Sequence, residues 1–293
     1  MVIIVTPQGQ LANRLFHAGQ FIANAIDYHY RLFHLSFEEY YPDYSEQLKL
    51  SSIQKYIRFV NINNKLFKWV IRLLIWIIRH ISTFNNGSFL FFCYINIPAG
   101  SWRNKVSYDL ISPTFIKKTK KITFIDGWEF SNECLLKKHR DVIVDIFKPN
   151  SGFRLETDQI IARFRKEYDV IVGVHIRRGD YKNFDHGVYY YEDHLYKERM
   201  QQVVQFPVLA SKNILFLLCS DEKVDTGYYD GFHTSYSQRH YIVDLLLLSA
   251  CDLIIGPPST FSMWASFYGV VPICQLMSGN QKISIDSFKV YGS

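Results

Sequence analysis

The sequence lacks the cysteine patterns that mark disulfide-bonded or zinc-binding proteins. Its five cysteines among 293 residues are scattered, odd in number, and form no CxxC pair. Disulfide scaffolds and structural zinc sites need cysteines that are paired or closely spaced. A reducing, cytoplasmic compartment is therefore expected, and no metal site is expected.

Common targeting and catalytic signatures are also missing. The start, MVIIVTPQG, has no basic region and no small-residue cleavage site, so it predicts a first strand rather than a signal peptide. The chain has no GxGxxG loop, P-loop, GxSxG elbow or HExxH helix, which counts against dinucleotide oxidoreductases, P-loop kinases, serine hydrolases and zinc proteases. It also has no DxD triplet, the metal–diphosphate clamp of many sugar transferases.

The charge is positive but not concentrated. The formal net charge is +6, yet there is no Lys/Arg block and no zinc-finger or RNA-recognition signature. This pattern counts against a nucleic-acid partner. It favours acidic small ligands or an anionic membrane surface.

What the chain does contain is an alternation of strand and helix patterns, which predicts an α/β fold with parallel sheets. A linker is expected at 148–152, between an N-terminal half (1–150) and a C-terminal half (151–293). Expected strands are 2–5, the start of 88–100, 121–125, 169–176, 213–219, 252–256 and 270–275, with a turn at Asp126–Gly127. Expected helices are 11–26, 65–81, one ending near 147, 155–167, 238–251 and 260–268, whereas 36–60 shows no clear period.

The segment 65–81, KLFKWVIRLLIWIIRHI, predicts an apolar helix with one basic stripe. Lys65, Lys68, Arg72 and Arg79 fall on one side at about 100° per residue. The segment is too short and too charged to span a bilayer. Two alternatives follow: a core helix with one solvated edge, or a helix that makes peripheral contact with the inner leaflet of a membrane.

The strongest chemical signal is GVHIRRGDY, in which His175, Arg177, Arg178 and Asp180 follow a strand. The carboxyl edge of an open α/β sheet faces its ligand crevice. Arginine keeps its charge and offers a planar fork to phosphate oxygens. The pattern indicates an anion site, and an Arg–Asp pair that only staples the loop is the alternative.

A second candidate is GPPSTFSMW, where Ser259, Thr260 and Phe261 open a helix after a strand. Hydroxyls and free N–H groups of a first helical turn suit a phosphate. The alternative is an ordinary N-cap by Ser259 with Phe261 in the core.

A third candidate is the loop before the first helix, PQGQLANRLF. Gly9 would let the backbone approach a ligand, and Asn13 and Arg14 lie at the helix entry. This loop matches no phosphate-binding fingerprint.

Together these segments resemble glycosyltransferase family 11, the α-1,2-fucosyltransferases. HIRRGDY at 175–181 matches the family's H-x-R-R-x-D stretch, and GQLANRLF at 9–16 is similar to its opening motif, with departures at Gln10, Ala12 and Arg14. The segments DGWEFSNECL, FLLCSDE and DLIIGPPSTFSMWASFYG look like further family motifs in the family's order. The resemblance implies a GT-B architecture with two facing Rossmann-like halves, and inverting, metal-independent transfer from GDP-fucose without a cofactor.

In that scheme the N-terminal half is the acceptor side and the C-terminal half binds the nucleotide sugar. Arg177 with Arg178 would stabilise the departing diphosphate, and Asp221 would contact ribose or guanine. The base on the acceptor hydroxyl stays open among Asp126, Glu129, Asp180 and Asp185. The alternatives are the same fold using another nucleotide sugar, or a module that binds sugar nucleotides or glycans without catalysis.

Overall fold

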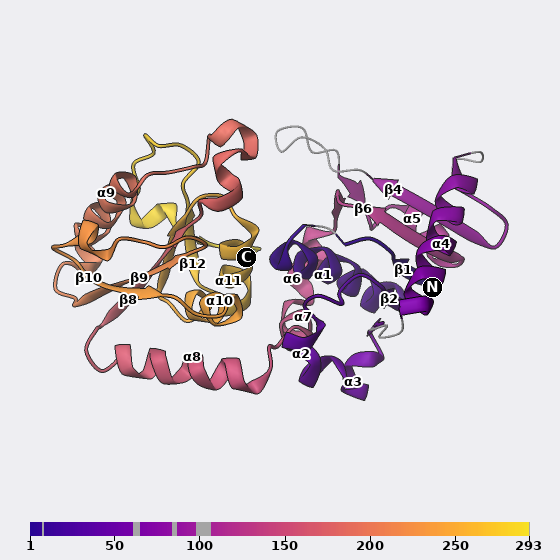
Figure 1. Ribbon diagram of the computed structural model, residues 1–293, viewed down its shortest axis with the longest axis horizontal. Coiled ribbons are helices and arrows are strands. Elements are labelled where there is room, and N and C mark those ends of the chain that lie inside the picture. Colours follow the sequence, from indigo (N-terminus) through magenta and orange to yellow (C-terminus); the bar gives the residue numbers. More distant parts are fainter. Residues whose placement is uncertain (8, 61–64, 84–86, 98–106, 293) are drawn as a thin grey trace. The chain divides into compact units, whose positions relative to one another are not determined.

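The computed structural model describes residues 1–7, 9–60, 65–83, 87–97 and 107–292, and it divides into two compact units, Met1–Asn150 and Ser151–Ser293 (Figure 1). Each unit contains its own sheet of parallel strands, accompanied by helices. The expectation of an α/β fold with parallel sheets is confirmed. Ser151 and Gly152, which were expected in a linker, are instead the first residues of α8.

The first unit has a five-stranded sheet in the order β3-β2-β1-β6-β4, parallel throughout. Its strands are β1 (Val2–Ile4), β2 (Leu32–His34), β3 (Ile57–Phe59), β4 (Phe92–Ile97) and β6 (Ile122–Gly127), and β5 (Tyr108–Asp109) pairs separately with β7 (Phe130–Ser131). Its helices are α1 (Leu11–Tyr28), α2 (Tyr41–Leu48), α3 (Ser51–Gln54), α4 (Lys65–Ser82), α5 (Pro113–Thr119), α6 (Glu133–Lys138) and α7 (Arg140–Ile146).

The second unit has a six-stranded sheet in the order β10-β9-β8-β11-β12-β13, in which only β13 runs antiparallel. Its strands are β8 (Val170–Ile176), β9 (Ile214–Ser220), β10 (His233–Ser237), β11 (Leu253–Gly256), β12 (Pro272–Gln275) and β13 (Lys289–Val290). Its helices are α8 (Ser151–Phe164), α9 (Asp193–Val204), α10 (Tyr241–Ser249) and α11 (Thr260–Gly269).

Runs of hydrophobic residues in the sequence form the buried core of each unit. All seven residues of β8 are buried, because β9 and β11 pair with its two edges and helices cover its faces. In α1, Leu15, Phe21 and Ile22 are fully buried at helical spacing, and the helix ends where His29 adopts a left-handed conformation with φ 55°.

The strand orders place a topological switch point in each unit. After β8 the chain runs outward through β9 and β10 on one side, whereas β11 pairs with β8 on the other. In the first unit β1 lies between β2 and β6 in the same way. Ligands of open α/β sheets bind outside the carboxyl ends of strands at such points.

Several expectations were wrong in detail. The single helix expected up to residue 147 is divided at His139 into α6 and α7, and Asp126–Gly127 is the end of β6 rather than a turn. The segment 36–60 contains α2, α3 and β3, and neither α9 nor β10 was anticipated. Residues 98–100 of the expected loop lie outside the described residues.

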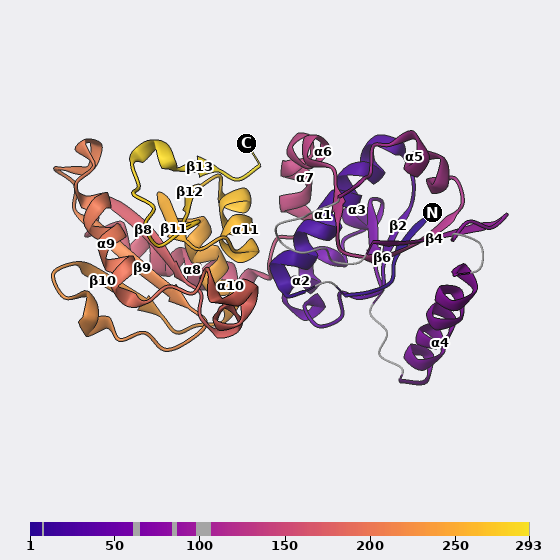
Figure 2. The ribbon, with the colours of Figure 1, turned by 90° about the horizontal axis from the view of Figure 1, so that it is seen from above.

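Helix α4 is not a core helix, because most of its large apolar side chains are exposed. Two members of its basic stripe, Lys68 and Arg79, pair with carboxylates of the first unit. Figure 2 shows α4 standing at the outside of this unit.

Candidate active site

Arg177 lies at the carboxyl end of β8, at the switch point of the second unit. One terminal nitrogen of its guanidinium, Nη2, is 2.7 Å from Oδ1 of Asp180, and the other, Nη1, is 2.8 Å from Oδ2 of Asp221. Asp221 follows β9, whose Ser220 is paired with Ile176 at the end of β8. Two neighbouring strand ends therefore bring this arginine and two carboxylates together.

The two ion pairs of Arg177 differ in strength. Asp180 is 56% exposed, and an ion pair with such a carboxylate contributes little because water competes for both charges. Asp221 is 22% exposed and also accepts a 2.9 Å hydrogen bond from the backbone N–H of Arg178. An incoming anion could therefore displace Asp180 from Arg177 more easily than Asp221.

Gly179 provides the space in which Asp221 reaches this loop. A Cβ atom built on Gly179 would lie 2.7 Å from Oδ2 of Asp221, well inside van der Waals contact. The glycine of the HIRRGDY motif is thus required here for a close approach rather than for a left-handed backbone.

Arg178 takes a different direction from Arg177. Its side chain is 12% exposed and its Nη2 lies 2.6 Å from Oδ1 of Asp193 on α9, an oxygen that also accepts a 2.5 Å hydrogen bond from the hydroxyl of Tyr229. Burial by itself would lower the pKa of Arg178, but the hydrogen bond and the negative charge of Asp193 outweigh it and raise the pKa. Arg178 holds α9 to the end of β8.

The start of α11 lies beside the β8 loop. Ser259 caps the helix by accepting a 3.3 Å hydrogen bond from the N–H of Phe261, and Thr260 is the first residue of the helix. Tyr181 donates a 2.7 Å hydrogen bond to the carbonyl of Pro258, and the guanidinium of Arg177 lies 5.7 Å from the centre of the Tyr181 ring. The first and second candidate segments therefore meet at one edge of the sheet, and Ser259 is both a cap and part of that edge.

His175 lies beneath this edge. It is 4% exposed, and its ring centre is 5.4 Å from that of Phe261. Burial, followed by the nearby charge of Arg177, lowers its pKa to about 3, so the imidazole is neutral at any ordinary pH. Its geometry fits support of the α11 start better than proton transfer.

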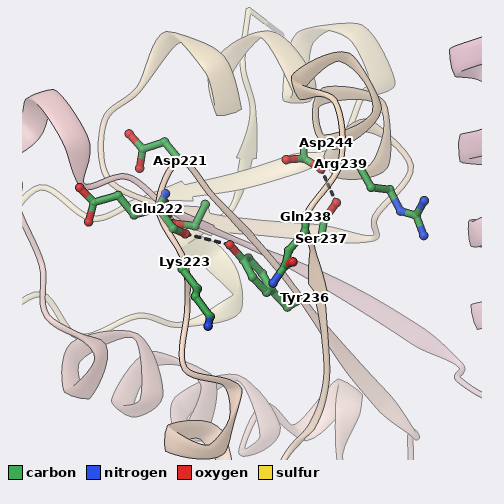
Figure 3. Close-up of a pocket in the computed structure, with 9 residues that line it drawn as sticks. Asp221, Glu222, Lys223, Tyr236, Ser237, Gln238, Arg239 and Asp244 are labelled. Carbon is green, nitrogen blue, oxygen red and sulfur yellow. Dashed lines mark hydrogen bonds between the residues drawn. The ribbon is translucent and has the colours of Figure 1, made fainter.

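A pocket of about 410 Å³ opens at the carboxyl ends of β9 and β10 (Figure 3). It is lined by residues 220–223 and 236–239 together with Asp244 of α10. Asp221 belongs both to this pocket and to the Arg177 cluster. The pocket therefore lies next to the Arg177 cluster.

Asp244 is the buried carboxyl group of the pocket, at 8% exposed. It accepts a short hydrogen bond from the hydroxyl of Ser237. Burial raises its pKa to about 6, although this hydrogen bond and the charge of Arg239 act in the opposite direction. Arg239 itself pairs with Glu156 of α8 at 2.6 Å.

In the first unit, the loop after β1 is held by its own residues. Gly9 has φ 59°, and a Cβ there would lie 2.3 Å from Nδ2 of Asn13. Arg14 is 11% exposed, donates to the carbonyls of Gly9 and Ser36, and pairs with Glu39 at 2.8 Å. In this structure Arg14 fastens the loop, and its proposed contact with the donor stays a prediction.

Asp126, a candidate base, ends β6 next to β1. It is 6% exposed and accepts hydrogen bonds from Thr6 at 2.6 Å, from Arg79 at 2.6 Å, and from the hydroxyl of Tyr94. Burial would raise its pKa, but these three donors and the Arg79 charge together lower it. A carboxylate held in this way is a weak base, and the arrangement favours a role in anchoring α4.

The other candidate bases are placed as follows. Glu129 is 8% exposed in the first unit, and Asp185 lies in a short 3-10 turn, Phe184–Gly187, of the second. Asp180 is the most exposed of the four candidates and pairs with Arg177. The second unit thus gathers His175, Arg177, Asp180, Asp221, Ser259, Thr260 and Phe261 at one edge, whereas Gly9, Asn13, Arg14, Asp126 and Glu129 belong to the first.

Sequence reasoning missed three groups that complete these clusters. Asp193 pairs with Arg178 and accepts a hydrogen bond from Tyr229, and Asp244 lines the pocket. Asp193 lies in YYYEDH and is the first residue of α9, and Asp244 is the one charged residue in YIVDLLLLS. An acid inside so apolar a helix was a signal that could have been used.

No family model matches this sequence, and no curated protein matches it. Solved structures do match. A mutant of Arabidopsis thaliana FUT1 in complex with GDP has a TM-score of 0.60 and 12% identity, over 98% of this chain and 72% of that one. POFUT1 in complex with GDP-fucose has a TM-score of 0.54 and 10% identity, over 91% and 93% of the two chains. The fucosyltransferase NodZ from Bradyrhizobium has a TM-score of 0.54 and 13% identity, over 94% of each. The chain has the fold of these fucosyltransferases, and the resemblance to family 11 in particular stays a prediction.

Proposed function

We propose that the protein is a glycosyltransferase that moves L-fucose from GDP-fucose to a hydroxyl of an acceptor glycan, with inversion and without a metal. The observation that carries the proposal is the position of Arg177, a permanent cation at the switch point of the second sheet. Solved structures with the same fold carry GDP or GDP-fucose, which supports this nucleotide as the donor.

The donor's diphosphate would lie between Arg177 and the start of α11. As the bond to the anomeric carbon breaks, negative charge grows on the β-phosphate, and a guanidinium placed there stabilises it. Displacement of the exposed Asp180 by the phosphate would free part of the Arg177 guanidinium and release a carboxylate close to the reacting centre. Asp180 is therefore the candidate base that the geometry of the second unit favours.

The pocket beside Asp221 would receive the nucleoside. Guanine presents adjacent N–H donors, which suit carboxylate acceptors, and the pocket offers Asp221, Glu222 and Asp244. Asp221 would then join both parts of the site, one oxygen holding Arg177 and the residue itself lining the pocket.

The test is a thermal-shift series with GDP, UDP and ADP, each with and without EDTA, followed by assays of GDP-fucose hydrolysis and transfer. GDP at about a hundred times its Kd should stabilise the protein by about 2.7 kcal/mol, with no loss in EDTA. Arg177→Ala should lower turnover on the order of a thousandfold and leave the far-UV spectrum unchanged. Equal stabilisation by UDP and GDP would point to the same fold using another donor, and wild-type turnover by Arg177→Ala would remove this arginine from the mechanism.

A further inference from the structure

Helix α4 exposes a wide apolar surface. Eight of its large apolar side chains are between 36% and 70% exposed: Leu66, Trp69, Val70, Leu73, Leu74, Trp76, Ile77 and Ile81. At about 100° per residue these side chains all fall on one side of the 18-residue helix, so they form a patch rather than scattered residues. Such patches on a folded protein mark places where something binds.

The rest of the helix is fastened to the first unit. Lys68 pairs with Glu38 at 2.6 Å, and Arg79 pairs with Asp126 at 2.6 Å. The hydroxyl of Tyr94 accepts a further 3.0 Å hydrogen bond from Nε of Arg79. Because these contacts fix the side of the helix that carries Lys68 and Arg79, the apolar side is held outward in a defined orientation.

The charges on α4 select an anionic partner. The helix contains no Asp or Glu, and two further cations, Lys65 and Arg72, are exposed. At about 100° per residue, Lys65 and Arg72 fall directly beside Trp69 and Trp76, along one margin of the apolar surface. Aliphatic residues on one face, tryptophans at its margin and cations next to them are the arrangement of helices that lie in a lipid interface.

Two more exposed apolar side chains follow α4 in the sequence. Gly87 donates to the carbonyl of Ser82 at the end of α4, and Leu90 and Phe91, just beyond, are 77% and 76% exposed. None of the described helices is both long enough and apolar enough to cross a bilayer. A surface of this kind would therefore lie along a membrane.

We propose that α4, with Leu90 and Phe91, docks the protein on a bilayer that contains anionic lipid, with the helix parallel to the membrane surface. A second copy of the chain is the less suitable occupant, because a two-fold contact through this face would bring the Lys65 and Arg72 cations of both copies to one interface. Anionic headgroups instead complement them. The proposal does not depend on the identity of the donor.

The test uses the full chain and vesicles of phosphatidylcholine, alone or mixed with phosphatidylglycerol. Flotation with the mixed vesicles is expected, together with a blue shift of tryptophan fluorescence. The double variant Trp69→Glu/Trp76→Glu should bind them at least about tenfold more weakly, because two apolar anchors become acidic. The matched control is Leu155→Glu/Val208→Glu, at positions in the second unit that are 60% and 62% exposed, and it should bind like the wild type.

Circular dichroism and thermal melting verify that each variant is folded. Light scattering without lipid reports the oligomeric state. The proposal is overturned if the wild type does not float with the mixed vesicles. It is equally overturned if the Trp69/Trp76 variant floats as well as the control. The face would belong to a second copy of the chain if the wild type bound no vesicles but formed a dimer without lipid, and if the Trp69/Trp76 variant were a monomer.

Discussion

Arg177 and Arg178 are neighbours in sequence with different surroundings. Arg177 holds one exposed and one half-buried carboxylate at the ligand edge, whereas Arg178 is fixed to Asp193 beneath α9. The sequence predicted two arginines acting together on phosphate. Successive residues after a strand tend to point in opposite directions, and the carboxylate that determines the role of Arg178 comes from a helix that the sequence pattern did not reveal.

Gly179→Ala should weaken donor binding without unfolding the protein. The added Cβ would lie 2.7 Å from Oδ2 of Asp221 and push this carboxylate away from Arg177. A loss of about tenfold or more in GDP affinity is expected, the size of one charge-assisted hydrogen bond. Isothermal titration measures it.

The control for this change is Gly152→Ala. Nothing lies within 4 Å of a Cβ built on Gly152, which is in α8, so this variant should bind GDP normally and melt at the same or a slightly higher temperature. Unchanged GDP affinity in Gly179→Ala would show that the position of Asp221 is unimportant for the nucleotide.

Asp244 should make the stability of the protein depend on pH. Burial raises its pKa to about 6 in the folded chain, from about 3.9 when unfolded, so the folded state binds the proton more tightly. The resulting contribution is fully present below about pH 4 and is lost as pH rises through about 6, by about 3 kcal/mol in all.

Asp244→Asn removes this titration while keeping the size of the side chain and an acceptor for Ser237. The melting temperature of Asp244→Asn minus that of the wild type should therefore increase from about pH 4 to about pH 8. A difference that stays flat over this range would mean that Asp244 is ionised in the folded protein throughout.

At the scale of elements, strand ends were the most predictable feature. β8, β9, β11 and β12 were expected within one or two residues, because each is a short apolar run bounded by polar or turn residues. Their pairing in parallel follows from the helices between them, and it brings Arg177 and Ser259 to one edge. This part of the site was predictable because it depends on strand order and not on side-chain geometry.

Helix α4 shows what the sequence pattern could not decide. The sequence predicts its length and its basic stripe, but it leaves open whether the helix belongs to the core or contacts a membrane. The structure turns Lys68 and Arg79 toward Glu38 and Asp126. These partners lie 30 and 47 residues away in sequence, and no periodicity within the helix reports on them.

Asp126→Asn should loosen α4 while leaving the sheet folded. Asp126 is 6% exposed and joins three donors, so losing its charge should cost about 1–3 kcal/mol. Hydrogen exchange of peptides within 65–82 is the measurement, and faster exchange there than in the wild type is expected.

Glu38→Gln is the matched variant, since it removes the ion pair between Lys68 of α4 and Glu38, whose side chains are 31% and 28% exposed. Its effect on exchange should be clearly smaller, because partly exposed pairs are weak. If the two variants behave alike, Asp126 is not the principal anchor of the helix.

At the scale of the whole molecule, both units repeat one device. Each places candidate residues at the carboxyl edge of a parallel sheet, at its switch point: Arg177 and Ser259 in the second unit, and the Gly9 loop with Asp126 in the first. The two units differ in what these residues contact. Arg14 and Asp126 are engaged by neighbours in their own unit, whereas Arg177 in the second unit lies beside a pocket that shares Asp221 with it.

This difference predicts where the nucleotide acts. Saturating GDP should slow hydrogen exchange in the segments that follow β8, β9 and β11, which supply Arg177, Asp221 and Ser259, because binding stabilises only the conformations that can hold the ligand. Amides 10–14 should exchange as they do without GDP, since Arg14 is already bound to Gly9, Ser36 and Glu39. Exchange by mass spectrometry with and without GDP, and with UDP as the control nucleotide, makes the comparison. Equal protection of amides 10–14 would contradict this prediction and support the expectation that Gly9, Asn13 and Arg14 bind the donor.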